Sequence, residues 1–155
     1  PETWHAIASA WTYDSGCAPL LWIVQQPTCD FATGLTIFGV EGVNWITTPT
    51  WQELSHKDYQ DSWKMCDIIV KRWIEDSFGS AEFTLATSSK GLEAYRIMEQ
   101  RYSAAGKMIT WDVPAFVDGY TGNRQAMSYV TWMNGALYWD FEVWKKQHIH
   151  QDLHG

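Results

Sequence analysis

An apolar repeat between residues 55 and 79 constrains the fold more than any other feature of the sequence. Apolar side chains recur there at steps of three and four, the spacing that places them on one face of an α-helix. The repeating residues are Tyr59, Trp63, Cys66, Val70, Trp73 and Ile74. Ser55 and Asp58 resemble a capping box in which Asp replaces the usual Glu, so we expect the helix to begin there. It is predicted to run to about Phe78 and to end at Gly79.

The opposite face of this helix carries charges of both signs. They are Asp61, Lys64, Asp67, Lys71, Arg72 and Glu75. Alternating signs along one helix face are typical of a solvated surface, so we expect these side chains to be exposed and to form no site.

Two shorter helices are predicted before this one. Trp4, Ile7, Ala8 and Trp11 have the spacing of one helical face, and the turn residues from Asp14 to Gly16 follow them. Pro19 suits the first turn of a second helix, because its missing N–H has no partner to lose there. The second helix is apolar on all sides up to Pro27, which stops it, so we expect it to be buried on most sides.

Two more helices complete the predicted bundle. Asp30 is a candidate N-cap for a helix over residues 31–40, with Phe31, Leu35 and Phe38 on its buried face. A loop is expected over residues 42–49. A last helix is predicted over residues 90–105, with Gly106 at its end.

The C-terminal fifty residues have a different pattern. Residues 107–114 are rich in β-branched side chains and end in Pro, so they are expected to be extended. Residues 128–144 contain Asn134-Gly135 between two apolar runs, which favours a β-hairpin. The alternative is a helix with Asn-Gly at its centre, at a cost of about 1 kcal/mol or more.

The sequence therefore predicts a mainly α protein, a compact bundle of about five helices with a small C-terminal extended or β-hairpin element. We expect residues 1–155 to form a single domain, with the helical bundle in residues 1–106 and the mixed part in residues 107–155.

Charge and hydropathy exclude several classes of partner. The 155 residues carry a net charge of −7, whereas binding to nucleic-acid phosphates requires a basic surface. No stretch reaches the roughly 18 unbroken apolar residues of a membrane-spanning helix. The first residues lack the basic flank and apolar run of a signal peptide. We therefore expect a cytoplasmic protein that binds neither nucleic acid nor membranes.

Tryptophan and cysteine are expected mainly inside the protein. Each of the 11 Trp residues combines a large apolar ring with one N–H, and we expect most of them in the core. Cys17, Cys29 and Cys66 are odd in number and have apolar neighbours. We interpret them as reduced thiols in a cytosolic core, because three scattered thiols favour neither a disulfide framework nor a zinc site.

No pattern in the sequence identifies a catalytic, cofactor-binding or metal-binding residue. His148, His150 and His154 form the most metal-like set, but they lie in the last eight residues, where chain ends fray. A Cys–His pair lacks the strand-to-helix turn that would make a thiol reactive. His5 is interpreted as a partly exposed helix residue. We expect no metal and no cofactor.

A pair of acidic residues in the predicted hairpin is the candidate partner surface. Asp140 and Glu142 are two positions apart on a strand, so their side chains share a face with that of Tyr138. This arrangement suits a basic partner, and the plainer interpretation is an ordinary solvent-facing strand. Tyr138, Asp140 and Glu142 are our candidate contact residues.

Short motifs follow one another in a fixed order through residues 11–38. They comprise an aromatic residue before a D-S-G turn, a W-I pair, the run P-T-C-D-F-A-T and an I-F pair. The residues concerned are Trp11, Tyr13, Asp14, Ser15, Gly16, Trp22, Ile23, Pro27, Cys29, Asp30, Ala32, Thr33, Ile37 and Phe38. This order resembles a family of small bacterial domains of unknown function, from whose pattern the sequence departs at Gly34 and Gly39. The likeness covers about the first forty residues and extends loosely beyond them.

The resemblance implies a function in binding. Such domains look like the immunity proteins encoded beside bacterial toxins and secreted effectors, and no catalytic residue carries over from them. We therefore expect a non-enzymatic protein that neutralises a cognate, basic toxin or effector by direct binding. The alternatives are a small enzyme or ligand-binding protein with a Trp-lined pocket, and a scaffold that forms a homodimer.

Overall fold

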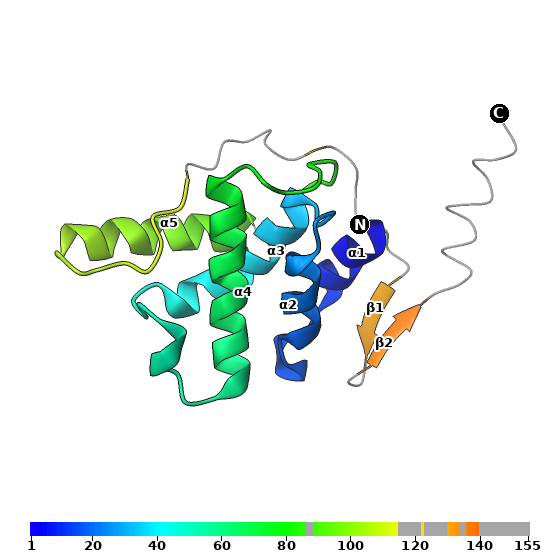
Figure 1. The fold of residues 1–155 in the computed structure, drawn as a ribbon, viewed down its shortest axis with the longest axis horizontal. Coiled ribbons are helices and arrows are strands. Elements are labelled where there is room, and N and C mark those ends of the chain that lie inside the picture. Colours follow the sequence, from blue (N-terminus) through cyan, green and yellow to red (C-terminus); the bar gives the residue numbers. More distant parts are fainter. Residues whose placement is uncertain (86–88, 115–121, 123–129, 134–135, 140–155) are drawn as a thin grey trace, which may run out of the picture.

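The computed structural model describes residues 1–85, 89–114, 122, 130–133 and 136–139, and this part of the chain is mainly helical (Figure 1). Its α-helices are α1 (Glu2–Ala10), α2 (Ala18–Gln25), α3 (Phe31–Glu41), α4 (Lys57–Ile74) and α5 (Ser89–Ala104). Three short 3₁₀ helices, η1 (Tyr13–Ser15), η2 (Gly42–Trp45) and η3 (Trp51–Glu53), lie in the connections. The predicted mainly α fold with five helices is confirmed for the described residues. The loop expected over residues 42–49 begins as the 3₁₀ helix η2 and is irregular from residue 46 on.

The central helix of the fold is α3, because helices α1, α2, α4 and α5 all pack against it. Every residue from Phe31 to Gly39 is buried. The prediction of one apolar face on this helix was therefore too narrow. Enclosure on all sides is the reason that its sequence is apolar nearly throughout.

Asp30 caps α3, as predicted, and also ties a distant segment to it. One carboxylate oxygen, Oδ1, accepts a hydrogen bond from the backbone N–H of Ala32 at 2.8 Å, which is an N-cap contact. The other, Oδ2, accepts from the Ser80 hydroxyl and from the Glu82 N–H, both at 2.7 Å. This buried side chain therefore joins the start of α3 to the segment that follows α4.

Helices α2 and α4 lie side by side and run in the same direction (Figure 1). At their C-terminal ends the Arg72 guanidinium donates hydrogen bonds to the carbonyls of Val24 and Gln26 at 2.8 and 2.9 Å. It therefore caps carbonyls that α2 leaves without intrahelical partners. Trp22 corrects the expectation for α2, since 53 % of it is exposed.

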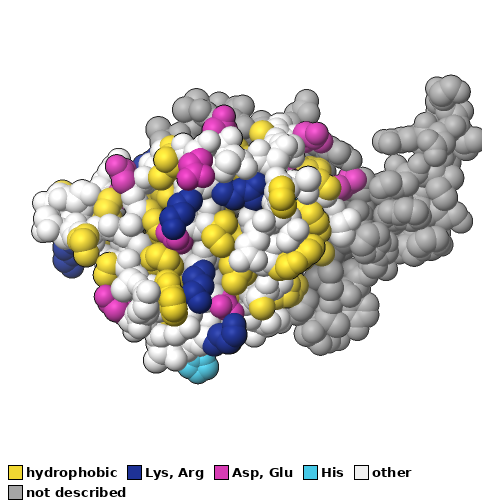
Figure 2. Space-filling model, in the orientation of Figure 1, with side chains coloured by type: hydrophobic (Ala, Val, Ile, Leu, Met, Phe, Trp, Pro, Cys, Tyr) yellow, Lys and Arg dark blue, Asp and Glu magenta, His cyan; other side chains and the backbone are white. Residues whose placement is uncertain are grey.

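At four of the six positions the outer face of α4 is not exposed as expected. Lys64 and Asp67 are half-buried. Arg72 is half-buried by its capping role, and Asp61 is buried, with its Oδ2 2.6 Å from Nζ of Lys57. Both side chains face neighbouring segments that the periodicity of α4 alone does not reveal. On the face of the molecule that carries α4, basic and acidic side chains are interspersed with apolar ones (Figure 2).

Both predicted ends of α4 need correction. His56 is the N-cap residue and makes no side-chain cap bond, so the predicted capping box is absent. Asp58 lies beside the first turn of the chain, where a Cβ on Gly16 would be 3.6 Å from its Oδ1. At the other end the helix stops at Ile74, because Asp76 adopts a left-handed φ of 49°.

Helix α5 ends as predicted, at a left-handed Gly106 with φ 67°. Its N-terminal half crosses α3 closely. A Cβ on Gly91 would lie 1.8 Å from the carbonyl oxygen of Gly39, so the two backbones touch there. A glycine is therefore required at position 91 for α5 to reach the core.

Residues 107–114 follow α5 without forming a helix or a strand, and two short strands are described further along the chain. The N–H of Thr110 donates to the carbonyl of Ile46 at 2.8 Å, which attaches residues 107–114 to the end of η2. Strands β1 (Val130–Met133) and β2 (Ala136–Trp139) pair antiparallel, with Met133 opposite Ala136. Asn134 and Gly135, the predicted turn, lie outside the described residues, so the hairpin as a whole stays a prediction.

The tryptophans are less buried than expected. Of the eight whose side chains are described, Trp63, Trp73 and Trp111 are buried, four are half-buried and Trp22 is exposed. No helix in the described part of the chain is both long and apolar enough to cross a membrane.

Candidate functional site

A pocket of about 520 Å³ opens near the N-terminal ends of α2 and α4, the ends that lie lowest in Figure 1. The chain around η1, the end of α3 with η2, and the first turns of α4 each contribute to it. Three carboxylates line it (Asp14, Glu41 and Asp58), together with three aromatic rings (Tyr13, Trp45 and Tyr59). We call it the acidic aromatic pocket. It is the candidate functional site.

The carboxylate of Glu41 is buried within the wall of the pocket. The Ser62 hydroxyl donates to its Oε2 at 2.5 Å, and the same hydroxyl accepts a hydrogen bond from the indole N–H of Trp45 at 2.7 Å. A weaker contact from the side-chain amide of Asn44 reaches Oε2 at 3.5 Å. This chain of hydrogen bonds fixes the carboxylate and the Trp45 ring relative to one another.

Tyr59 carries the aromatic surface out to solvent. It is 55 % exposed, and its ring centroid lies 5.7 Å from that of Trp45 and 5.7 Å from that of His56. A large exposed ring supported by two others is typical of a contact surface, because it offers apolar area with little conformational freedom to lose.

Negative charge in the pocket is not balanced by its own lining. No Lys, Arg or His is among the described residues that line it. Lys57, the cation next to Asp58 in the sequence, is paired with Asp61 at 2.6 Å. The pocket is therefore a region of negative potential on a negatively charged chain.

The negative charge of the pocket also affects the pKa values of Tyr13 and Cys17. Burial first, and then the charge of Glu41, raise the pKa of the Tyr13 hydroxyl. The same two causes raise the pKa of Cys17 to about 11. The Tyr13 hydroxyl is shielded from solvent and has no hydrogen-bond partner among the described residues. Both groups stay protonated at neutral pH.

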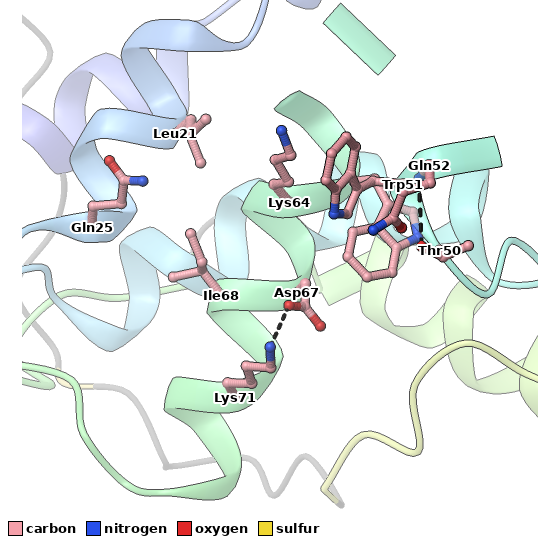
Figure 3. A pocket seen from close by; sticks show the side chains of 10 residues that line it. Leu21, Gln25, Thr50, Trp51, Gln52, Lys64, Asp67, Ile68 and Lys71 are labelled. Carbon is pink, nitrogen blue, oxygen red and sulfur yellow. Dashed lines mark hydrogen bonds and ion pairs between the residues drawn. The ribbon is translucent and has the colours of Figure 1, made fainter. Parts of the chain in front are cut away.

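A second pocket, of about 400 Å³, lies between α2, η3 and α4 (Figure 3). Trp51 and Trp63 line it, together with two lysines and one carboxylate. The Lys64 ammonium lies 3.9 Å from the centre of the Trp51 ring, and Lys71 is paired with Asp67 at 2.7 Å (Figure 3). Among the described residues the Lys64 ammonium therefore has a ring contact but no carboxylate partner.

Of the three residues predicted as partner contacts, the structure describes the backbone of Tyr138 alone. Tyr138 lies on β2, opposite Thr131 of β1. Asp140 and Glu142 lie outside the described residues, as do His148, His150 and His154. Among the described residues no group of three metal-ligating side chains comes together.

His5 is a fully buried residue, contrary to the expectation of partial exposure. Its Nδ1 lies 3.0 Å from the Thr33 hydroxyl oxygen, and its ring stacks on Phe83 with centroids 4.7 Å apart. Burial lowers the pKa of His5, and the nearby Asp30 carboxylate opposes this shift more weakly. The imidazole is therefore a neutral part of the core.

The lowered pKa of His5 predicts a loss of stability in mild acid. The unfolded chain binds a proton at His5 near pH 6.5, whereas the folded chain does so only at lower pH. Stability is therefore fully present above pH 6.5 and falls as the pH drops below it, by at most about 1.4 kcal/mol per pH unit. Urea unfolding of the wild type and of His5→Gln from pH 7.5 to 5.5 tests this. The same pH dependence in both proteins would contradict it.

The three thiols are predicted to be unreactive in the folded protein. Cys17, Cys29 and Cys66 are buried and free, in agreement with the expectation of reduced core thiols. Burial raises the pKa of Cys29 to about 12 and that of Cys66 well above its usual value. A thiol reagent at pH 8 should therefore label the native protein only as fast as it unfolds. Labelling within seconds without denaturant would show that this assignment is wrong.

Residues 1–73 match the family model of a domain of unknown function, DUF4274. The match runs from α1 almost to the end of α4, well beyond the first forty residues, and the carboxylates and rings of the acidic aromatic pocket all lie within it. Comparisons with curated proteins and with solved structures gave no significant match.

The sequence had placed Asp14 in a turn and Asp58 in a cap, and it had not singled out Glu41, Trp45 or Tyr59 as site residues. One signal was present for Glu41. A negative charge in the last turn of an apolar helix opposes the helix dipole, so its presence there calls for a local reason.

Proposed function

We propose that this chain is a non-enzymatic protein-binding module of the bacterial cytoplasm, an immunity protein that neutralises a cognate toxin or secreted effector by direct binding. The observation that carries the proposal is the acidic aromatic pocket, in which three carboxylates and three rings gather with no cation in the described lining. The partner presents a basic surface.

In such an interface the aromatic side chains provide binding energy, and the acidic side chains attract the partner. Tyr59 and Trp45 are the anchors, since hot spots of protein interfaces are rich in large rings that lose water on binding. Asp14 and Asp58 lie at exposed positions and attract a basic partner over a distance. The net charge of −7 adds to this steering.

The chemistry of the buried groups supports binding over catalysis. The pKa of each cysteine is raised by burial, so none of the thiols is an activated nucleophile. His5 is neutral, fully buried and held by Thr33. These groups stabilise the fold and leave the pocket to recognition.

Co-expression with the product of the gene immediately upstream tests the proposal. We expect that product to inhibit growth, and this chain to restore growth and to form a complex with it. Tyr59→Ala should weaken the complex by about 10- to 100-fold, the effect of removing an interface anchor. The matched control is Tyr102→Ala, which removes the same ring type from the far end of α5. An upstream product that neither inhibits growth nor binds the chain overturns the proposal.

The C-terminal segment with Tyr138, Asp140 and Glu142 remains a second proposed contact. Ala at both Asp140 and Glu142 removes the two carboxylates first predicted to meet a basic partner. If this double variant slows association and Tyr59→Ala does not, the contact lies on the C-terminal segment with Tyr138 and not at the pocket.

A ligand-binding protein is the second candidate function. The pocket of Figure 3 favours it, because it is lined by Trp51 and Trp63 and its size lies within the range of small-molecule sites. A metabolic operon around the gene, with no toxin beside it, would support this candidate over the first.

A further inference from the structure

Glu41 is a buried carboxylate with no counter-ion in the described part of the chain. It is 8 % exposed, and no described Lys, Arg or His lies within ion-pair distance of it. It is also the last residue of α3, where the partial negative charge of the helix end makes a carboxylate unfavourable. Burying an uncompensated charge destabilises a fold, so this position serves something other than stability.

Two polar atoms in the pocket wall are left without partners. Both hydrogen bonds to Glu41 go to Oε2, and no described residue donates to Oε1. The Tyr13 hydroxyl, which lines the same pocket, is shielded from solvent and also lacks a partner. Buried polar groups are nearly always satisfied, so the Tyr13 hydroxyl marks the place of a missing partner, and Oε1 of Glu41 stays open to a donor from outside the described chain.

The side chains that line the pocket suit a flat cation. Trp45 and Tyr59 provide ring surface beside the carboxylates, and cations bind to the faces of such rings. A guanidinium has five N–H donors in one plane and is more weakly hydrated than an ammonium. It can therefore stack on a ring while its edge donates to several oxygen acceptors.

We infer that the acidic aromatic pocket receives one arginine side chain of the protein partner, with Glu41 as its buried counter-ion. Asp14 and Asp58 attract the incoming charge at the rim, and the rings enclose the guanidinium. That the arginine belongs to a toxin or effector rests on the proposed function. The pocket itself is tested without the partner.

The experiment titrates the full chain with methylguanidinium and, in parallel, with methylammonium at constant ionic strength. Binding is followed by the indole N–H resonance of Trp45, assigned by its disappearance in Trp45→Phe. We expect saturable binding of methylguanidinium with a Kd of about 1–10 mM, which is reasonable for so small a ligand. Methylammonium should bind several-fold more weakly.

Glu41→Gln is the decisive variant, because it keeps an acceptor for Ser62 and removes the charge. We expect it to weaken methylguanidinium binding about tenfold or more. Its thermal midpoint should be no lower than that of the wild type, since it relieves an unpaired buried charge. Glu75→Gln, at the exposed end of α4, is the matched control and should bind as the wild type does.

Each outcome decides the inference. No saturable binding, binding that Glu41→Gln leaves unchanged, or tighter binding of methylammonium would overturn the arginine assignment. If the complex with the upstream product forms all the same, the proposed function stands and the arginine assignment alone is wrong. If methylguanidinium binds as expected but no partner is found, the pocket stands and the immunity function fails.

Discussion

Replacing Arg72 with alanine is expected to lower the free energy of unfolding by about 3 kcal/mol. The guanidinium donates to four backbone carbonyls, those of Val24, Gln26, Pro27 and Ser77, at distances between 2.8 and 3.2 Å. The first two are partly buried at the C-terminal end of α2, so their loss leaves acceptors without partners. The guanidinium also lies over the Phe78 ring, with 4.7 Å between Arg72 Cζ and the ring centre.

Urea unfolding followed by circular dichroism measures this loss as a lower midpoint at an unchanged slope. Lys71→Ala is the control, because its pair with Asp67 is an exposed i,i+4 contact worth less than about 1 kcal/mol. Arg72→Lys should retain less than half of the stabilisation, since one ammonium cannot reach four carbonyls. Equal midpoints for Arg72→Ala and Lys71→Ala would show that the cap contributes nothing.

Replacing Gly91 with alanine is expected to cost about 3 kcal/mol, although alanine is the better helix former by about 1 kcal/mol. The new Cβ would lie 1.8 Å from the Gly39 carbonyl oxygen and 2.5 Å from its carbon. Both atoms belong to the backbone of α3, so no side chain can move aside and α5 must separate from α3. The contacts of Tyr95 with Phe38 would loosen with it.

The same change at Gly106 separates the clash from the loss of glycine itself. Gly106 has a left-handed φ of 67° and open space where the Cβ would lie, so its alanine variant should lose only about 1 kcal/mol. Thermal unfolding of the two variants compares them directly. A Gly91→Ala midpoint equal to that of Gly106→Ala would contradict the close crossing of α3 and α5.

Local signals in the sequence predicted the helices well. Pro19, Asp30 and Gly106 mark helix ends through their own backbone or side-chain chemistry, and the structure places each in that role. Where a competing local solution exists, prediction failed. Ser55 does not cap α4, and the helix ends before the left-handed Asp76 and not at Gly79 as predicted.

Long-range packing could not be predicted from the sequence. His5, Asp61 and Arg72 belong to polar faces by their spacing, yet each is wholly or partly buried by segments far away in the chain. The type of a residue does not reveal which distant segment will cover it, or which polar groups of that segment will lie beside it. Likewise, the need for a glycine at position 91 becomes clear only from the close crossing of α3 and α5.

The acidic aromatic pocket could not be predicted from the sequence either, because it too depends on long-range packing. Asp14 comes from η1, Glu41 from the end of α3 and Asp58 from the first turn of α4, and each had a plain local interpretation or none. The contacts first predicted, Tyr138, Asp140 and Glu142, came from a local alternation of side chains. A surface assembled from distant loops has no such periodic signature.

Hydrogen exchange of the chain, free and in complex with the upstream product, tests whether the partner binds at the acidic aromatic pocket. We predict that backbone amides of residues 13–17, 42–46 and 57–62 exchange more slowly in the complex, because these segments surround the pocket. Slower exchange confined to residues 130–139, with unchanged rates around the pocket, would contradict it.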